Sequence, residues 1–239
     1  MKILALETSA KSVSAAVVEN GAVLASAYQN TGLTHSVTLM PLIDSMLKNA
    51  GLTAKDMDLI AAAAGPGSFT GLRIGVSAAK GLAWALEFPC CGVSTLEAMA
   101  ENARAFDGTV ICAMDARRQQ IYNAVFDCHD GILTRRCEDR AVALEVLAEE
   151  LKNDNNRKII VGDGAQLCYT YLSEHGIACR LAPPDSLYQK AVGVGLAAER
   201  MAAEGRTVTA QALCPVYLRL SQAERERLAK GLPITLDHQ

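Results

Sequence analysis

The order of apolar and polar positions in residues 1–106 predicts a sheet followed by alternating helices and strands. Three strand-like runs come first, and Asn20-Gly21 between the second and the third is a strong hairpin signal. Runs with helical periodicity then alternate with short buried runs. The predicted strands are Lys2–Thr8, Val13–Glu19, Ala22–Tyr28, Met57–Ala64 and Cys90–Val93, and the predicted helices are His35–Asn49, Leu72–Leu86 and a run from Ser94 or Thr95 to about Phe106.

A similar pattern restarts after Asp107-Gly108 and predicts a second mixed half. Its strands are Val110–Asp115, Ile121–Asp127, a run after Asp130-Gly131, Lys158–Val161 and Ile177–Leu181, and its helices are Leu144–Lys152, Ala165–His175 and Ser186–Glu204. The charged stretch from Ser221 is predicted to be a solvated tail. The order of elements in residues 1–106 is that of a ribonuclease-H-like or actin-like half. We therefore expect an α/β protein with two related mixed-sheet subdomains, residues 1–106 and 107–239.

The composition is that of a globular protein, because half of the 239 residues are hydrophobic. The net charge of -3 gives no general basic field, so any contact with nucleic acid would be local or shared with a partner. No run approaches the roughly 20 apolar residues of a membrane span, and the first 30 residues lack a secretory signal pattern. We expect a cytoplasmic protein that does not contact a membrane.

The eight cysteines are predicted to be reduced, and most of them to lie in the core. They show no Cys-x-x-Cys spacing, and the four histidines are scattered along the chain. The sequence therefore predicts no metal site.

Glu7, Thr8 and Ser9 end the first predicted strand. In folds of this type an acidic residue and small hydroxyls at this place can face a nucleotide phosphate and its metal ion. A tight turn whose hydroxyls satisfy backbone donors explains the same residues equally well.

A glycine-rich run, Gly65-Pro66-Gly67-Ser68-Phe69-Thr70-Gly71, lies between a buried strand and a helix. Glycines allow close backbone approach and a helix N-terminus offers free N–H groups, so Gly65, Gly67 and Ser68 are candidate phosphate contacts. The run matches neither a Walker loop nor Gly-x-Gly-x-x-Gly. The alternative is a chain-reversing turn capped by Ser68 or Thr70.

The helices His35–Asn49 and Leu72–Leu86 are more apolar than one core-facing stripe requires. In the second helix, small residues alternate with large ones and would admit a close helical neighbour. Either the second half of the chain or a partner protein covers this surface, and we favour a partner. The predicted interface consists of Leu39, Met40, Ile43, Met46, Leu47, Arg73, Ile74, Ser77, Ala78, Gly81 and Leu82.

Asp115-Ala116-Arg117-Arg118 ends a predicted strand and opens a turn. These charges either face a cleft between the two halves or form a surface hairpin with a local ion pair. The sequence slightly favours the surface hairpin.

Several motifs together resemble the TsaB (YeaZ) family over nearly the whole chain. They are Glu7-Thr8-Ser9, Thr34-His35-Ser36 with Leu39-Met40-Pro41-Leu42-Ile43, Gly65 to Gly75, Asp115-Ala116-Arg117 with Tyr122, and Pro215-Val216-Tyr217-Leu218-Arg219. The resemblance implies an actin-like (ASKHA) fold. It also implies a role in making threonylcarbamoyladenosine beside the anticodon of tRNAs that read codons beginning with A.

The same resemblance implies a non-catalytic subunit that pairs with the transferase TsaD and with the ATPase TsaE. TsaD-like proteins carry a His-x-x-x-His metal motif, and aligning that motif after Val93 places Thr95 and Met99 at the ligand positions. A hydroxyl and a thioether are poor replacements for imidazole. Nothing in the residues supports the M22 peptidase activity once assigned to such proteins, and no catalytic residue is predicted.

The expected interactions follow from this resemblance. The two helices would dock on TsaD, or on a second copy of the chain when TsaD is absent, and tRNA would be contacted only through the complex. No cofactor is expected to be required, although weak ATP or ADP binding near Glu7 and Gly67 is open. The rival functions are a nucleotide-binding regulator, an autonomous ATPase or sugar-kinase-like enzyme, and direct tRNA binding through Arg117 and Arg118.

Overall fold

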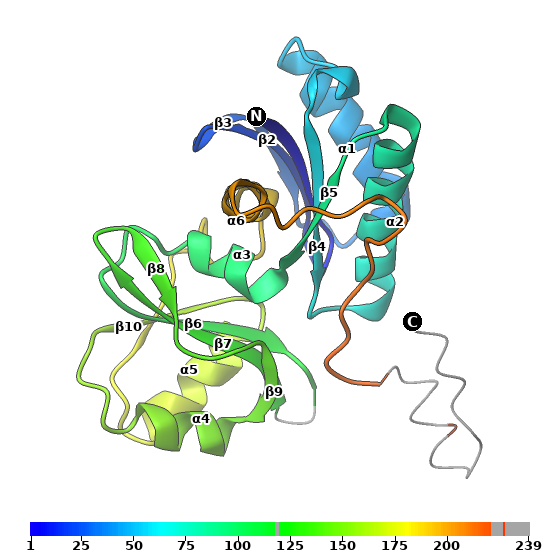
Figure 1. The fold of residues 1–239 in the computed structure, drawn as a ribbon. Coiled ribbons are helices and arrows are strands. Elements are labelled where there is room, and N and C mark those ends of the chain that lie inside the picture. The colour runs from blue at the N-terminus through cyan, green and yellow to red at the C-terminus, as the bar shows by residue number, and fades with distance from the viewer. Residues whose placement is uncertain (118–119, 221–226, 228–239) are drawn as a thin grey trace.

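The computed structural model describes residues 1–117, 120–220 and 227 (Figure 1). Its first sheet begins with an antiparallel meander of β1 (Lys2–Glu7), β2 (Val13–Glu19) and β3 (Ala22–Gln29). β4 (Leu59–Gly65) and β5 (Cys90–Ser94) continue it in parallel beyond β1, so the strand order is β3-β2-β1-β4-β5. The predicted meander is confirmed, and β3 forms one edge of the sheet.

Helices cover both faces of the first sheet (Figure 1). α1 (His35–Asn49) and α2 (Phe69–Leu86) pack on one face with a short 3-10 turn, η1 (Ala54–Asp56), beside them. α3 (Thr95–Glu101) and α6 (Ala191–Ala203) lie on the other face. Side chains of β1 alternate between the two cores, and both faces are therefore buried.

The second sheet has the strand order β11-β10-β6-β7-β8, and β9 also pairs with β7. Two helices cover one face of this sheet, and α3 packs on the other face. Its elements are β6 (Gly108–Asp115), β7 (Gln120–His129), β8 (Ile132–Arg135), β9 (Arg140–Ala143), α4 (Leu144–Leu151), β10 (Lys158–Val161), α5 (Ala165–Glu174) and β11 (Arg180–Leu181). Two mixed sheets with helices on their faces give the predicted actin-like α/β fold.

Several predicted boundaries were wrong for local reasons. α2 begins at Phe69 rather than Leu72, because the Ser68 hydroxyl accepts a hydrogen bond from Gly71 N at 3.3 Å and caps the helix one turn earlier. α3 ends at Glu101 and is followed by turns as far as Phe106. The sequence analysis also missed the short strand β9.

α6 begins at Ala191 rather than Ser186, because tertiary hydrogen bonds hold the residues before it in a turn and bends. The carbonyls of Leu187 and Tyr188 accept bonds from Gly162 N and from the Asn102 side chain. The Ser12 hydroxyl donates to the carbonyl of Gln189 at 3.2 Å. These contacts compete with the helical bonds that the local sequence would allow.

α6 returns to the first sheet, where it packs on β1, β2, β4 and β5. The predicted boundary at residue 106 thus separates the two sheets but not the helices that cover them. The charged tail predicted from Ser221 lies outside the described residues except for Arg227. Among the residues described, no helix is long and apolar enough to cross a membrane. The predicted burial of most cysteines is confirmed, since five of the eight free thiols are buried.

Candidate functional site

We call each sheet with the helices around it a lobe. A cleft of about 630 Å³ lies between the two lobes. The ends of β1 and β4 bring Ser9, Gly67 and Ser68 to one wall, because parallel strands place their carboxyl ends at the same edge of a sheet. The ends of β6 and β10 bring Asp115 and Asp163 to the opposite wall. This position is where ligands bind in many open α/β sheets.

Glu7 ends β1 beneath this cleft and is fully buried. One carboxylate oxygen, Oε1, accepts a hydrogen bond from Ser9 N at 2.6 Å. The other, Oε2, has no hydrogen-bond partner among the described residues. Burial raises the pKa of Glu7 to about 7, against the opposing effect of the hydrogen bonds from Ser9. The carboxyl therefore exchanges its proton near neutral pH.

Asp163 lines the cleft and is a carboxylate that was not predicted as a site residue. Burial raises its pKa, and the Gln189 side chain donates a hydrogen bond to it at 3.0 Å. The negative charge of Asp163 also raises the pKa of Glu7. The sequence signal that could have found it is Gly162-Asp163-Gly164, a polar turn directly after a buried strand.

The glycine-rich run packs against its own chain. A Cβ on Gly67 would lie 2.6 Å from the carbonyl oxygen of Ser9, and a Cβ on Gly71 would lie 2.1 Å from that of Thr8. Ser68 N donates to Ser9 O at 2.7 Å, and the Thr8 hydroxyl donates to Gly71 O at 2.7 Å. These glycines therefore permit close contact between the two loops. The Thr8 hydroxyl and the Ser9 carbonyl take part in this contact, whereas the Ser9 hydroxyl has no hydrogen-bond partner among the described residues.

Residues 215–220 form a C-terminal segment that we call the strap. Its last four residues, 217–220, line the cleft. Val216 N donates to Ala64 O at 2.7 Å, and a Cβ on Gly65 would lie 2.2 Å from Val216 O. The Tyr217 ring stacks on Phe69 with the centroids 4.4 Å apart. Arg219 then donates to the carbonyl of Ala116, so the strap bridges the two lobes.

Asp115 and Arg117 line the cleft, although the surface hairpin was slightly favoured from the sequence. Arg117 N donates to the Asp115 carboxylate at 2.7 Å and closes the turn. Arg118 lies outside the described residues. The turn therefore adds one carboxylate and one guanidinium to the wall of the second lobe.

A second candidate site is an apolar groove of about 680 Å³ between α1, η1 and α2. We call this groove and the exposed residues around it the helical face. Met40, Ala78, Gly81 and Leu82, four of the residues predicted for the interface, line this groove. Trp84 is 72% exposed beside it. An apolar groove with an exposed tryptophan beside it is typical of a protein interface.

Some residues predicted for the interface are unavailable to a partner. Four residues of α1 are buried against the first sheet, because the helix needs them to complete its own core: Leu39, Ile43, Met46 and Leu47. Ile74 is half-buried against that core, and Ser77 is exposed. Arg73 is exposed, but its guanidinium lies over the Phe69 ring at 4.0 Å and its Nε donates to the Tyr217 hydroxyl at 3.1 Å.

The sequence analysis missed two exposed residues of the helices, Trp84 and Val37, which is 70% exposed. The signal was present in the apolar stripe, which is too wide for one buried face. Sequence periodicity alone does not say which part of a wide stripe faces the core.

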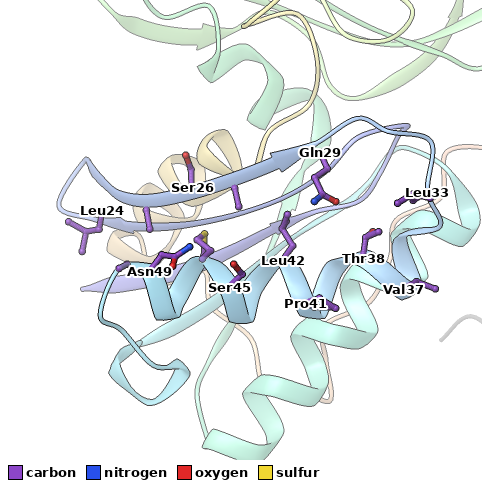
Figure 2. Close-up of a pocket in the computed structure, with 14 residues that line it drawn as sticks. Leu24, Ser26, Gln29, Leu33, Val37, Thr38, Pro41, Leu42, Ser45 and Asn49 are labelled. Atoms are coloured by element: carbon purple, nitrogen blue, oxygen red, sulfur yellow. The ribbon is translucent and has the colours of Figure 1, made fainter.

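A further groove of about 570 Å³ runs between the edge strand β3 and α1 (Figure 2). Leu24 and Ser26 of β3 lie on one side, and Pro41 and Ser45 of α1 lie on the other. Val37 and Leu33 stand at one end. The lining combines apolar and small polar side chains without charge.

The positions aligned with the TsaD metal ligands lie in the interior. Thr95 and Met99 are both fully buried, and Met99 packs in the core between α3 and the second sheet. Among the described residues, one exposed group could hold a metal ion: Asp107, His129 and Asp130, which lie elsewhere, at the start of β6 and the turn after β7. The buried pair offers a metal ion no imidazole or carboxylate.

Two lobes of mixed α/β structure around a cleft define the class as actin-like. A family model described as TsaD, tRNA N6-adenosine threonylcarbamoyltransferase, matches residues 29–226. The chain is 33% identical to the tRNA threonylcarbamoyladenosine biosynthesis protein TsaB of Bacillus subtilis over 94% of this chain and 96% of that protein. It is also 33% identical to the Escherichia coli TsaB over 92% and 95% of the two chains.

Solved structures agree with these matches. YeaZ from Pseudomonas aeruginosa superposes with a TM-score of 0.76 at 29% identity, covering 91% of this chain and 99% of that one. The chain belongs to the TsaB (YeaZ) family, whose members take part in tRNA threonylcarbamoyladenosine biosynthesis.

Proposed function

We propose that this chain is a non-catalytic subunit of a cytoplasmic complex that forms threonylcarbamoyladenosine beside the anticodon of tRNAs reading codons that begin with A. It acts by docking on a TsaD-type protein through the helical face. The TsaD-type partner carries out the transfer, and a TsaE-type ATPase joins the complex. Support comes from the family, from the exposed groove, and from the interior character of Thr95 and Met99.

Gly81 is the observation that carries the proposal. It lies inside an 18-residue helix, it is exposed, and no atom lies within 4 Å of where its Cβ would be. A glycine in a helix interior costs roughly 0.5–1 kcal/mol relative to alanine, so one without an internal packing reason points to an external one. Ala78, Ala85 and Gly81 lie on one side of the helix, where a partner helix can approach closely.

The experiment is a pull-down of a tagged TsaD-type protein with wild-type chain and with Gly81→Arg. The variant has space for the new side chain within its own fold, and we expect its affinity for the partner to fall at least tenfold. Val146→Arg is the matched control, since Val146 is 49% exposed on α4 in the other lobe. Normal binding by a folded Gly81→Arg chain would falsify the docking assignment.

The same variants test the remaining parts of the proposal. Without its partner the chain forms a homodimer through the helical face, so size-exclusion chromatography with light scattering should find wild-type dimers and Gly81→Arg monomers. In a reconstituted reaction with TsaD-type and TsaE-type proteins and the threonylcarbamoyl-adenylate, product formation should depend on this chain. Product that forms equally well without it contradicts the subunit role.

A nucleotide-binding regulator or autonomous ATPase is the second candidate, and the cleft with Glu7 and Asp163 is the observation that favours it. We propose instead that the subunit needs no nucleotide. Two backbone N–H groups that a phosphate would require in this turn are already engaged, since Ser68 N donates to Ser9 O and Gly71 N donates to the Ser68 hydroxyl. Calorimetry with ATP and ADP, in the presence and absence of the partner, should detect at most weak binding and no turnover by the chain alone.

A further inference from the structure

Two arginines of the second lobe converge on one aromatic ring. Arg157 immediately precedes β10, and Arg180 lies in the neighbouring edge strand β11. Their guanidinium carbons lie 5.2 Å and 4.6 Å from the centroid of the Phe106 ring. Both arginines are exposed, whereas Phe106 is only 5% exposed. We call this group the arginine pair.

The arginine pair has no counter-charge among the described residues, unlike six other arginines of the described chain. Six others each have a carboxylate within 4.0 Å: Arg104, Arg135, Arg136, Arg140, Arg200 and Arg206. In residues 1–117 and 120–220, no Asp or Glu comes that close to Arg157 or Arg180. Two like charges held on one ring repel each other, and an anion placed between them would relieve that repulsion.

The backbone around the arginine pair is fixed. Arg157 O accepts a hydrogen bond from Thr109 N at 2.8 Å, and a Cβ on Gly108 would lie 2.3 Å from that oxygen. Gly108 has a φ of +138°, which lets the chain turn tightly from Phe106 into β6. Arg180 is in register with Ile159 of β10. Each arginine therefore starts from an ordered strand end, so binding orders few additional atoms.

We propose that Arg157 and Arg180 contact the phosphate backbone of RNA. The guanidinium fork matches phosphate oxygens bidentately, and its stacking on Phe106 leaves the N–H edges free for this contact. Because Phe106 is buried, it offers no surface on which a base could stack. The contact is therefore with the backbone and independent of base sequence.

The placement of the arginine pair suits a subunit that is docked on a protein partner. α3 and α6 lie on the opposite face of the first sheet from α1 and α2, toward the second sheet (Figure 1). Docking through the helical face would leave the arginine pair accessible to the RNA. The choice of RNA over an acidic protein rests on the proposed function in a tRNA-modifying complex.

The test measures binding of the full chain, without any partner protein, to a fluorescent unmodified tRNA transcript between 50 and 200 mM KCl. For Arg157→Gln with Arg180→Gln, we expect at least a tenfold loss of affinity at the lowest salt concentration. The slope of log affinity against log salt should fall by roughly 0.7–0.9 for each arginine. Arg206→Gln is the control, because it removes an exposed charge that is paired with Glu204.

Three results would overturn the proposal. They are unchanged binding by the double variant, an equal loss with Arg206→Gln, and competition by polyglutamate as strong per charge as competition by unlabelled tRNA, which would indicate an acidic protein ligand. As a second measurement, Asp107→Asn should tighten RNA binding about twofold, since it removes a negative charge next to Phe106. None of these assays contains a TsaD-type protein, so their failure is distinguishable from failure of the docking proposal.

Discussion

Three glycines on the single helix α2 have opposite surroundings. A Cβ on Gly71 would lie 2.1 Å from the backbone oxygen of Thr8, and a Cβ on Gly75 would lie 2.3 Å from its hydroxyl oxygen. A Cβ on Gly81, nearly two turns further along, would meet no atom within 4 Å. The N-terminal half of the helix is thus fitted to the cleft loops of its own chain, while Gly81 in the C-terminal half faces outward.

The difference teaches that a glycine-rich segment can serve two purposes within one element. Near the cleft, glycine removes a side chain so that two loops of the same chain can touch. On the helical face, it leaves room that no part of the described chain fills. Substitutions can therefore separate the role of the glycines near the cleft from that of Gly81. The former would disturb the fold of the chain, and the latter would disturb docking.

The largest expected effect is that of Gly71→Ala. The new methyl group would collide with a backbone carbonyl that cannot rotate away, so the free energy of unfolding should fall by about 3 kcal/mol or more. Urea denaturation followed by circular dichroism measures this change. A loss below about 1 kcal/mol would mean that the two loops are loosely packed, and the contrast with Gly81 would fail.

Glu7→Gln tests whether the Glu7 carboxyl is buried, through the pH dependence of the free energy of unfolding. Because the folded-state pKa of Glu7 is raised from 4.5 to about 7, ionisation is penalised in the native state. The wild-type protein is relatively most stable below pH 4.5, and that stability is lost as the pH rises through about 7. The wild-type protein should lose about 3 kcal/mol of unfolding free energy from this group between pH 4.5 and pH 8, and the variant should not.

The measurement is the difference in unfolding free energy between wild type and Glu7→Gln at a series of pH values. Glutamine can still accept the hydrogen bond from Ser9 N, so the comparison isolates the charge. Asp163 is present in both proteins, and its own titration largely cancels in the difference. A difference that is flat from pH 5 to pH 8 would show that Glu7 is solvated in solution.

The smallest effect is that of Gly81→Ala, the counterpart of the first substitution. In the monomer alanine has free space here and favours the helix, so the chain should gain about 0.5–1 kcal/mol of stability at protein concentrations too low for the homodimer. Thermal melting of the Gly81→Ala and Gly71→Ala proteins side by side should give shifts of opposite sign. Destabilisation by both substitutions would remove the distinction between the two halves of α2.

Local sequence signals predicted most elements of the fold. Asn20-Gly21 marked the hairpin, and the helix His35–Asn49 was found with its observed bounds. Errors arose where distant residues supply hydrogen bonds, as they do before α6, where the side chains of Ser12 and Asn102 bind backbone carbonyls that a helix would use. Contacts of this kind leave no trace in a short window of sequence.

The candidate sites were only partly predictable. The sequence selected Glu7 and the groove residues of α2, but it also assigned Leu39 and Ile43 to a surface that they do not reach. Asp163 was overlooked because its importance depends on the neighbouring lobe, whose position a linear pattern does not contain.

The sequence by itself determined the class of fold and the family, since hydrophobic periodicity, turn residues and a specific set of motifs are local properties of the chain. Only the tertiary structure decided what the glycines, the apolar stripes and the arginines do. Each of these depends on which atoms come within a few ångströms, and that distance is set by the packing of segments far apart in the chain. Gly71 and Gly81 are the same residue on the same helix, and only their neighbours distinguish an internal contact from an open surface.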